Sequence, residues 1–115
     1  LRGEEVPLTS GEQLRDFLYV EDVARCLCNL LVSTCSGTFN ISSGEEIKLK
    51  DIAGTIGSLT DRSELLKFNA IPNRANEPKK IVGINAKIQN SLDFFPKVGL
   101  TEGLQRTLEW WKNNV

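Results

Sequence analysis

The sequence predicts an α/β fold that has short strands and about four helices. Residues 14–20 form an extended run, rich in aromatic and branched side chains, which turns at two acidic residues into helix-period apolar spacing. Similar helical stripes follow at residues 49–59, 85–92 and 101–113. The short apolar segments between them are bounded by glycine, serine, asparagine or proline, which is typical of short strands.

The N-terminal part is predicted to contain an extended segment, a turn and the first helix. Residues 5–8 are extended, and the composition of residues 9–12 indicates a turn. The first helix is expected over residues 21–32, because carboxylates in its first turn interact favourably with the helix dipole. We expect one broad apolar face to pack on a sheet. It consists of Val20, Val23, Ala24, Leu27, Leu30 and Leu31.

The middle of the chain is predicted to alternate between strands and a helix. Residues 38–41 indicate a strand that ends at a Ser-Ser-Gly turn, where we expect Asn40 to tie a loop through side-chain to backbone hydrogen bonds. A second helix is expected over residues 49–59. A short strand is expected over residues 65–70, and two prolines and two asparagines exclude regular structure from residues 71–80.

The last two helices are predicted at residues 85–92 and 101–113. Asn85 and Thr101 are residue types that cap helix N-termini, so we expect them to begin these helices. Phe94, Phe95 and Pro96 lie between the helices and are expected to pack. The buried stripe of the last helix is predicted to contain Leu104, Leu108 and Trp111.

Composition excludes several classes of protein. A chain of 115 residues with 40% hydrophobic residues can form one domain with a modest core. The net charge of −1 provides no global attraction to nucleic acid or to a membrane, and no apolar run approaches the roughly 20 residues of a membrane span. We expect a cytoplasmic protein whose three cysteines are reduced, partly buried and bind no metal.

Positive charge is concentrated in one segment. Residues 67–90 contain five cations (Lys67, Arg74, Lys79, Lys80 and Lys87) and one anion, Glu77. Any anion-binding site is therefore expected to be local and to include this segment. Arg15 is a further cation, near the start of an otherwise apolar strand, where it is expected to pair with Asp16 or to cap a neighbouring carbonyl group.

Residues 15–24 carry a resemblance to a known family. Their sequence, Arg-Asp-Phe-Leu-Tyr-Val-Glu-Asp-Val-Ala, resembles the RDF-h-x-V-x-D-h-A signature of the extended short-chain dehydrogenases, which include nucleotide-sugar epimerases and dehydratases. The likeness extends to the C-terminus. It implies that this chain is the C-terminal substrate-binding lobe of a Rossmann-type enzyme, and that it binds a nucleoside-diphosphate sugar.

The resemblance also assigns roles to individual residues. It implies that Arg15 and Arg74 bind the diphosphate from two sides and that Lys48 approaches it from the start of the second helix. Glu77 matches the family's acidic substrate-binding residue in type and spacing. Leu8 matches a position that holds the nucleotide base, and Asn76 stands where glycine is common, so we expect a different local backbone there.

The catalytic and cofactor motifs of the family are missing from this sequence. No Gly-x-x-Gly-x-x-Gly follows an N-terminal strand, and Tyr19, the only tyrosine, is followed four residues later by Val23, so Tyr-x-x-x-Lys is absent. We therefore expect residues 1–115 to be a single lobe of a larger protein. NAD or NADP would be bound by an N-terminal Rossmann domain, with no cofactor and no catalytic residue in this chain.

Two alternatives remain open at this point. The chain could belong to a non-enzymatic sensor or scaffold derived from the same fold, or it could be a stand-alone interaction domain that binds no nucleotide. In the enzyme interpretation, apolar surface that faces the Rossmann domain favours self-association of the isolated chain. The candidates for that surface are Val6, Leu8, Phe17, Leu18, Phe39 and Ile41.

Overall fold

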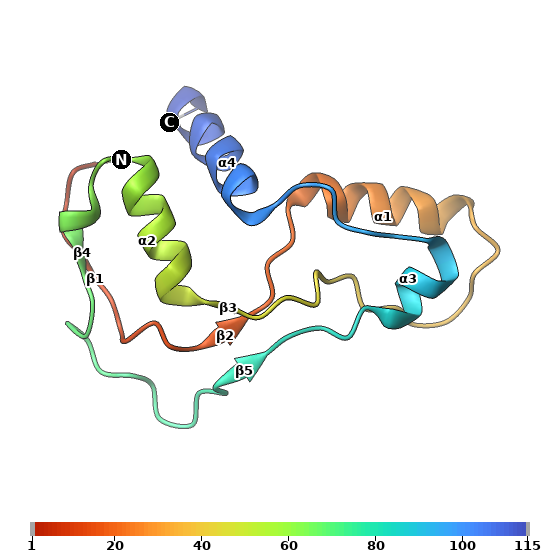
Figure 1. Ribbon diagram of the computed structural model, residues 1–115, viewed down its shortest axis with the longest axis horizontal. Helices are drawn as coiled ribbons and strands as arrows, with labels where there is room; N and C mark the ends of the chain where they lie inside the picture. The colour runs from red at the N-terminus through yellow and green to blue at the C-terminus, as the bar shows by residue number, and fades with distance from the viewer. Residues whose placement is uncertain (1, 115) are drawn as a thin grey trace.

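A computed structural model describes residues 2–114 as a flat α/β unit, with principal extents of 49 × 38 × 18 Å (Figure 1). Its helices are α1 (Val20–Val32), α2 (Leu49–Leu59), α3 (Ala86–Leu92) and α4 (Leu100–Asn114), and a 3₁₀ helix, η1, spans Ser63–Leu65. The α/β class and the four helices predicted from the sequence are confirmed. None of these helices has the length and apolarity that crossing a membrane requires.

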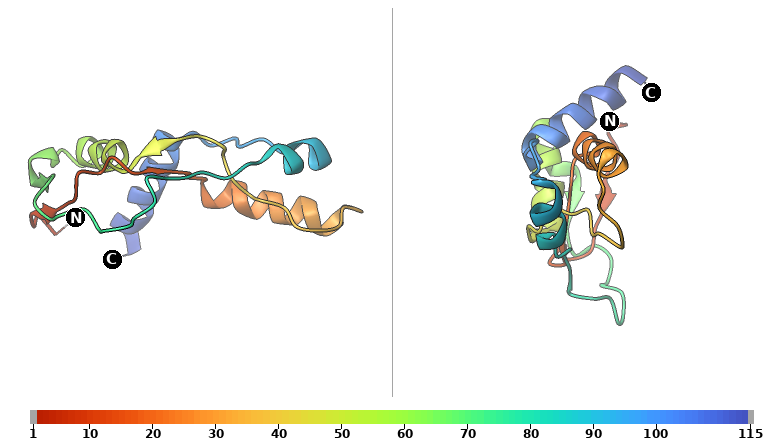
Figure 2. Two further views of the ribbon diagram at one scale, coloured as in Figure 1. Left: turned by 90° about the horizontal axis from the view of Figure 1, so that it is seen from below. Right: turned by 90° about the vertical axis from the view of Figure 1, so that its right-hand side faces the viewer.

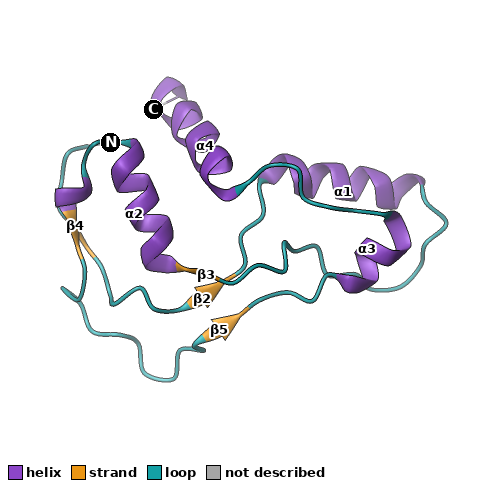
Figure 3. Cartoon of the chain, in the orientation of Figure 1, coloured by secondary structure: helices purple, strands orange, loops and turns teal. Residues whose placement is uncertain are grey.

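Two small sheets connect the helices (Figure 3). In the first, β1 (Val6–Pro7) runs parallel to β4 (Leu66–Lys67). In the second, β2 (Leu14–Arg15) lies between antiparallel β3 (Ile47–Lys48) and parallel β5 (Lys80–Ile81). Because β2 is central, its residues are placed next to both the start of α2 and the irregular segment that precedes β5.

The predicted strands are longer than the observed ones. Residues 38–41 form no strand, because no neighbouring strand in the described chain lies beside them to complete a ladder. Asn40 nevertheless ties this loop to the segment before α3, since its Nδ2 donates to the carbonyl oxygen of Ile84 (3.3 Å). In the 65–70 region, only Leu66 and Lys67 pair, directly after η1.

The core is small and lies between α1, α3 and the segment after α3. Cys26, Ile88 and Phe94 are fully buried there, so the predicted packing of Phe94 is confirmed, whereas that of Phe95 is wrong, because its side chain is exposed. Leu18, Phe39 and Ile41 pack against this cluster and are half-buried, so part of the surface predicted to face a partner domain is covered within this chain. Val6 and Phe17 do remain exposed.

The buried face of α1 differs from the predicted one. Asp22 and Cys26 are buried, whereas four apolar residues of the predicted face, Val20, Ala24, Leu27 and Leu31, are exposed. Only Val23 and Leu30 of that face are half-buried. In the views of Figure 2, α1 lies along one side of the flat unit, so its outward face has no covering layer.

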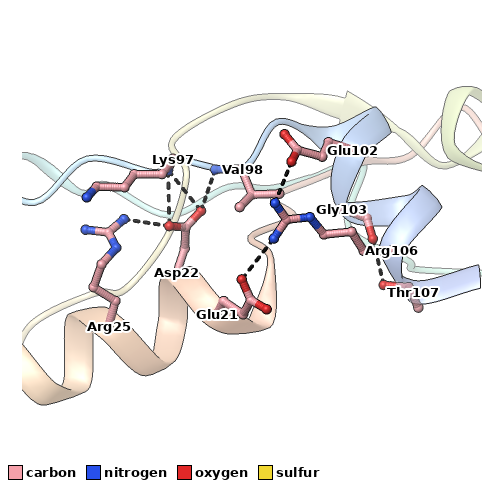
Figure 4. A network of polar contacts seen from close by, with 9 residues as sticks. All are labelled: Glu21, Asp22, Arg25, Lys97, Val98, Glu102, Gly103, Arg106 and Thr107. Carbon is pink, nitrogen blue, oxygen red and sulfur yellow. Dashed lines mark hydrogen bonds and ion pairs between the residues drawn. The ribbon is translucent and has the colours of Figure 1, made fainter. Parts of the chain in front are cut away.

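Asp22 determines this rotation of α1 (Figure 4). The backbone N–H groups of Lys97 and Val98 donate to its carboxylate at 2.9–3.1 Å, and Arg25 Nη2 donates at 2.5 Å. Burial opposes ionisation of Asp22, but the hydrogen bonds from Val98, Arg25 and Lys97 outweigh it and lower the pKa of this carboxyl below its ordinary value. Asp22 therefore fixes α1 to the segment that leads into α4.

Asp16 fixes a second junction. Its carboxylate accepts hydrogen bonds from the backbone N–H and hydroxyl of Ser43 and from the N–H groups of Gly44 and Gly83. Burial again opposes ionisation, but these four hydrogen bonds lower the pKa of Asp16. The chain after β2 is thus joined to the loop before β3 and to the segment after β5.

The ends of α3 and α4 correct two capping predictions. Asn85 precedes α3, but its side-chain Nδ2 donates to the carbonyl oxygens of Ser42 and Ser43 instead of capping the helix. Helix α4 begins at Leu100, with the carbonyl oxygen of Gly99 accepting from Gly103 N–H, so Thr101 is not its N-cap.

The packing of α4 also differs from the predicted stripe. Gly103 is the buried residue of this helix. The ring of Tyr19 packs so closely against it that a Cβ at position 103 would lie 3.1 Å from the ring. Leu104 and Leu108 are only half-buried, and Trp111 is exposed, so the predicted buried stripe is wrong at Trp111. Arg106 links α4 to α1 by pairing with both Glu102 and Glu21 (Figure 4).

Candidate functional site

A charged cavity lies beside the three-stranded sheet. It has a volume of about 550 Å³, within the range of small-molecule sites. Its walls come from the segment that leads into β2 and from the irregular segment that leads into β5. The lining residues are Ser10, Glu12, Gln13, Leu14, Asn73, Arg74, Glu77, Lys79 and Lys80.

Hydrogen bonds between residues far apart in sequence hold the two walls together. Asn73 Oδ1 accepts hydrogen bonds from the backbone N–H and the hydroxyl of Ser10 (3.2 and 3.1 Å). At the other end, the backbone N–H of Leu14 donates to the carbonyl oxygen of Lys79 (2.9 Å). The cavity is therefore part of the fold and does not depend on one flexible loop.

Glu77 is fixed in the wall by two donors. Arg15 Nη2 pairs with Glu77 Oε1 at 3.0 Å, and Gln13 Nε2 donates to Oε2, also at 3.0 Å. Arg15 Nη1 donates to the carbonyl oxygens of Leu14 and Pro78. Of the alternatives for Arg15, carbonyl capping is confirmed and pairing with Asp16 is wrong, because the guanidinium reaches Glu77 instead.

Glu12 holds two lysines at the edge of the cavity. Its carboxylate accepts from Lys48 Nζ at 2.8 Å and from Lys50 Nζ at 2.5 Å. The hydrogen bonds from Lys48 and Lys50 lower the pKa of Glu12 to about 2, so this carboxyl stays ionised at neutral pH. The predicted candidate Lys48 is therefore near the cavity, but its ammonium group is directed to a protein carboxylate.

Positive charge dominates the surroundings of the cavity. Each carboxylate in or next to the cavity already has a basic partner, and Lys80 pairs with Glu46. Arg74 and Lys79 line the cavity and form no ion pair with residues 2–114. Six cations surround three carboxylates. The cations are Arg15, Lys48, Lys50, Arg74, Lys79 and Lys80; the carboxylates are Glu12, Glu46 and Glu77.

Leu8 lies outside this cavity, at the first sheet. Its backbone N–H donates to the carbonyl oxygen of Lys67 and its own carbonyl oxygen accepts from Ile71 N–H, so both backbone groups are used within the protein. Its side chain is half-buried. Of the five predicted site residues, Arg74 and Glu77 line the cavity, Arg15 and Lys48 contact its lining residues, and Leu8 does not.

The turn around Asn76 corrects one expectation. Asn76 has φ = 62°, a left-handed conformation that glycine adopts freely and asparagine tolerates. The N–H of Glu77 donates to the carbonyl oxygen of Arg74 across this turn (3.4 Å). Asparagine at position 76 is therefore compatible with a turn of the kind that glycine forms. This turn connects Arg74 to Glu77, and both residues line the cavity.

A second cavity, of about 280 Å³, lies between residues 17–20 and α4. It is lined mainly by apolar groups, among them Phe17, Val20 and Leu104, and contains no charged side chain. It offers no counter-charge for an anion, so the cavity beside the three-stranded sheet is the candidate site.

Comparison with known proteins points to one family. The model of the NAD dependent epimerase/dehydratase family matches residues 1–42. Over its whole length, the chain is also 30% identical to dTDP-glucose 4,6-dehydratase 1 of Escherichia coli. The chain therefore resembles the NAD-dependent epimerase/dehydratase family, by the family model over residues 1–42 and by identity to the dehydratase over its whole length.

Solved structures of similar proteins agree with this assignment. A UDP-glucose 4-epimerase of Thermotoga maritima, solved with UDP-glucose, matches 97% of this chain with a TM-score of 0.87 and 29% identity. MoeE5, solved with UDP-glucuronic acid and NAD, matches all of it with a TM-score of 0.86 and 28% identity. The match covers 36% and 39% of those two chains and 34% of the dehydratase, so this chain spans about a third of its relatives' length.

Sequence reasoning did not identify Gln13 and Lys79 as residues of the cavity. Gln13 is nearly buried, and its Oε1 has no hydrogen-bond partner among the described residues. Lys79 was visible only as one of five cations in its segment. The available signal was the position of both residues next to strands that pair, β2 and β5, but the pairing itself depends on tertiary structure.

Proposed function

We propose that this chain is the nucleotide-sugar-binding part of an NAD-dependent sugar epimerase or dehydratase. The observation that carries the proposal is the charge of the cavity: Arg74 and Lys79 line it without an ion-pair partner, whereas both lining carboxylates, Glu12 and Glu77, are already paired with basic residues. A nucleoside diphosphate has the complementary negative charge, and the solved relatives with UDP-glucose and UDP-glucuronic acid bind ligands of this class.

The side chains suggest distinct contributions to binding. Arg74 lines the cavity without an ion-pair partner and can donate two hydrogen bonds to phosphate oxygens. Arg15 is already bound to Glu77, so it reaches the diphosphate only if part of that pair is exchanged, and otherwise it positions Glu77. Glu77 supplies acceptor oxygens for ligand hydroxyl groups. Lys48 adds long-range attraction. Leu8 lies outside the cavity, so its half-buried side chain contacts the nucleotide base only where the ligand extends to the first sheet.

The described residues do not fit a dinucleotide cofactor. The connection from β2 to α1 contains no glycine, and β3 continues directly into α2. Gly83, between β5 and α3, donates its N–H to Asp16, and Ser42 occupies the space beside it. We therefore propose that NAD or NADP binds a part of the protein outside this chain and that residues 1–115 are the substrate-binding lobe, without catalytic residues.

The exposed face of α1 fits the same arrangement. Val20, Leu27 and Leu31 are 68%, 54% and 85% exposed on one stripe of the helix. We propose that the cofactor-binding part of the protein covers this stripe. A non-enzymatic sensor or scaffold derived from the same fold would have the same stripe and would lack only the catalytic residues in the rest of the protein.

Nuclear magnetic resonance titration of this chain with UDP-glucose tests the proposed function. We expect saturable chemical-shift changes in residues 10–14 and 73–80. Arg74→Gln should weaken binding by roughly ten- to a hundredfold, since one charge-assisted hydrogen-bonding group contributes about 1.5–3 kcal/mol. Arg62→Gln is the control, because Arg62 is exposed and lines a different cavity.

The titration can also reject the proposal. If UDP-, dTDP-, CDP- and GDP-sugars all leave residues 10–14 and 73–80 unchanged, the chain is an interaction domain that binds no nucleotide. If UDP-glucose binds but Arg74→Gln matches the unmodified chain, the ligand lies elsewhere on the protein.

Replacing Glu12 should strengthen anion binding. Glu12→Gln removes the carboxylate that holds Lys48 and Lys50, so both ammonium groups can turn to the cavity. We expect UDP-glucose to bind about two- to fivefold more tightly, the scale of an exposed charge. Glu64→Gln, an exposed change in η1, should have no effect. Weaker binding of UDP-glucose to the Glu12 variant would mean that the Glu12 carboxylate itself contacts the ligand.

A further inference from the structure

Lys79 occupies a fixed position on the cavity wall. Its carbonyl oxygen accepts from Leu14 N–H at 2.9 Å, immediately before the pairing of β2 with β5. Its side chain lines the cavity together with that of Arg74. The next residue, Lys80, pairs with Glu46 and is therefore already neutralised. The backbone thus holds one lysine at the cavity with its charge unused.

Other cations without an ion pair lie in different surroundings. Arg2 and Arg62 share a cavity with Glu4 and Glu5; Glu5 pairs with Lys67, but Glu4 forms no ion pair with the described residues, so that cavity keeps a carboxylate for a cation. Lys97 shares a small cavity with Glu45. At the candidate site, by contrast, the two lining carboxylates are held by Arg15, Gln13, Lys48 and Lys50. Within residues 2–114, Arg74 and Lys79 both line this cavity, and neither forms an ion pair with its carboxylates.

We propose that Lys79 is a second anion-binding residue, which acts with Arg74 on two adjacent phosphate groups of the ligand. This inference rests on the proposed function and adds a residue to it. A planar guanidinium binds two oxygens of one phosphate, whereas an ammonium group is a compact charge that contacts a second. Two such groups on one wall favour a diphosphate over a monophosphate, because a single phosphate can satisfy only one of them fully.

Binding of UDP and UMP to the chain and to its Lys79→Gln variant tests the proposal. The unmodified chain should prefer UDP. Lys79→Gln should weaken UDP binding about five- to tenfold and change UMP binding less than twofold, so that the preference for UDP is largely lost. Lys79→Arg should retain most of the preference, because it keeps the charge. Lys112→Gln, an exposed change near the end of α4, is the matched control.

The outcomes separate this inference from the proposed function. Loss of UDP binding in Arg74→Gln with unchanged binding in Lys79→Gln overturns the role of Lys79 and keeps the site. An equal loss for UDP and UMP in Lys79→Gln also overturns it, since Lys79 would then act on any phosphate through its charge alone. If UDP does not bind the unmodified chain in titrations that follow residues 10–14 and 73–80, the proposed function itself fails.

Discussion

Replacing Asp22 by alanine is expected to destabilise the fold by about 3–5 kcal/mol. The variant leaves two part-buried backbone N–H groups, those of Lys97 and Val98, without the buried carboxylate that accepts from them, and a lost hydrogen bond to a charged group costs about 1.5–3 kcal/mol. It also removes the partner of Arg25 from a position that is 1% exposed. A loss of this size is a large fraction of a small domain's total stability.

Urea unfolding followed by circular dichroism measures this loss. Glu21→Ala is the matched control: Glu21 is the preceding residue, its side chain is 65% exposed, and it pairs only with Arg106. The control should cost less than about 1 kcal/mol, as expected for a surface ion pair. Equal stability of Asp22→Ala and the unmodified chain would show that the link between α1 and the 97–98 segment does not support the fold.

The same carboxylate should control acid stability. Hydrogen bonds lower the pKa of Asp22, and of Asp16, below the unfolded value of about 3.9. Their contribution to stability is therefore fully present above that value and is lost as the pH falls through the lower folded pKa. Asp22→Ala should consequently lose less stability than the unmodified chain between neutral pH and about pH 2.

The helices were predictable because local sequence determines them. The predicted bounds of the second helix match α2, and α1 begins one residue before its predicted start. The strands were less predictable, because each contains only two residues and exists through a neighbour far along the chain. A strand predicted at residues 38–41 lacks such a neighbour here, and the apolar pattern alone cannot reveal that.

The candidate site was partly predictable for a related reason. The resemblance to the family selected Arg74 and Glu77, which match its pattern in type and spacing, and the structure places both on one cavity. The sequence could not indicate that Glu77 would pair with Arg15, or Glu12 with Lys48, because these pairs are 62 and 36 residues apart. Charge pairing across such separations depends on the tertiary fold, and it decides which cations remain available to a ligand.

The exposed side of α1 leads to the largest expected effect on association. An amphipathic period predicts that a helix has an apolar face, but the hydrogen bonds of Asp22 turn a different face toward the described core. Val20, Ala24, Leu27 and Leu31 are left as a stripe that faces solvent. Burying a leucine side chain is worth about 1.5–3 kcal/mol, so this stripe is a strong site for association.

We expect this chain, on its own, to self-associate through the α1 stripe at micromolar concentrations. Leu27→Gln combined with Leu31→Gln should weaken association by at least about a hundredfold, because each leucine contributes roughly tenfold or more. The pair should leave folding stability nearly unchanged, since both side chains are already exposed. Ile84→Gln is the control: Ile84 is 78% exposed but lies outside α1, so its replacement should not change association.

Sedimentation velocity over a concentration series measures the association, and urea unfolding confirms that the double variant folds. If the double variant sediments like the unmodified chain, association uses another surface, for which the exposed side chains of Val6 and Phe17 are the next candidates. A chain that stays monomeric up to high micromolar concentrations would argue against the proposal that α1 needs a covering domain. In that case the flat unit is stable with its apolar stripe in water, because Asp16 and Asp22 hold its segments together without that cover.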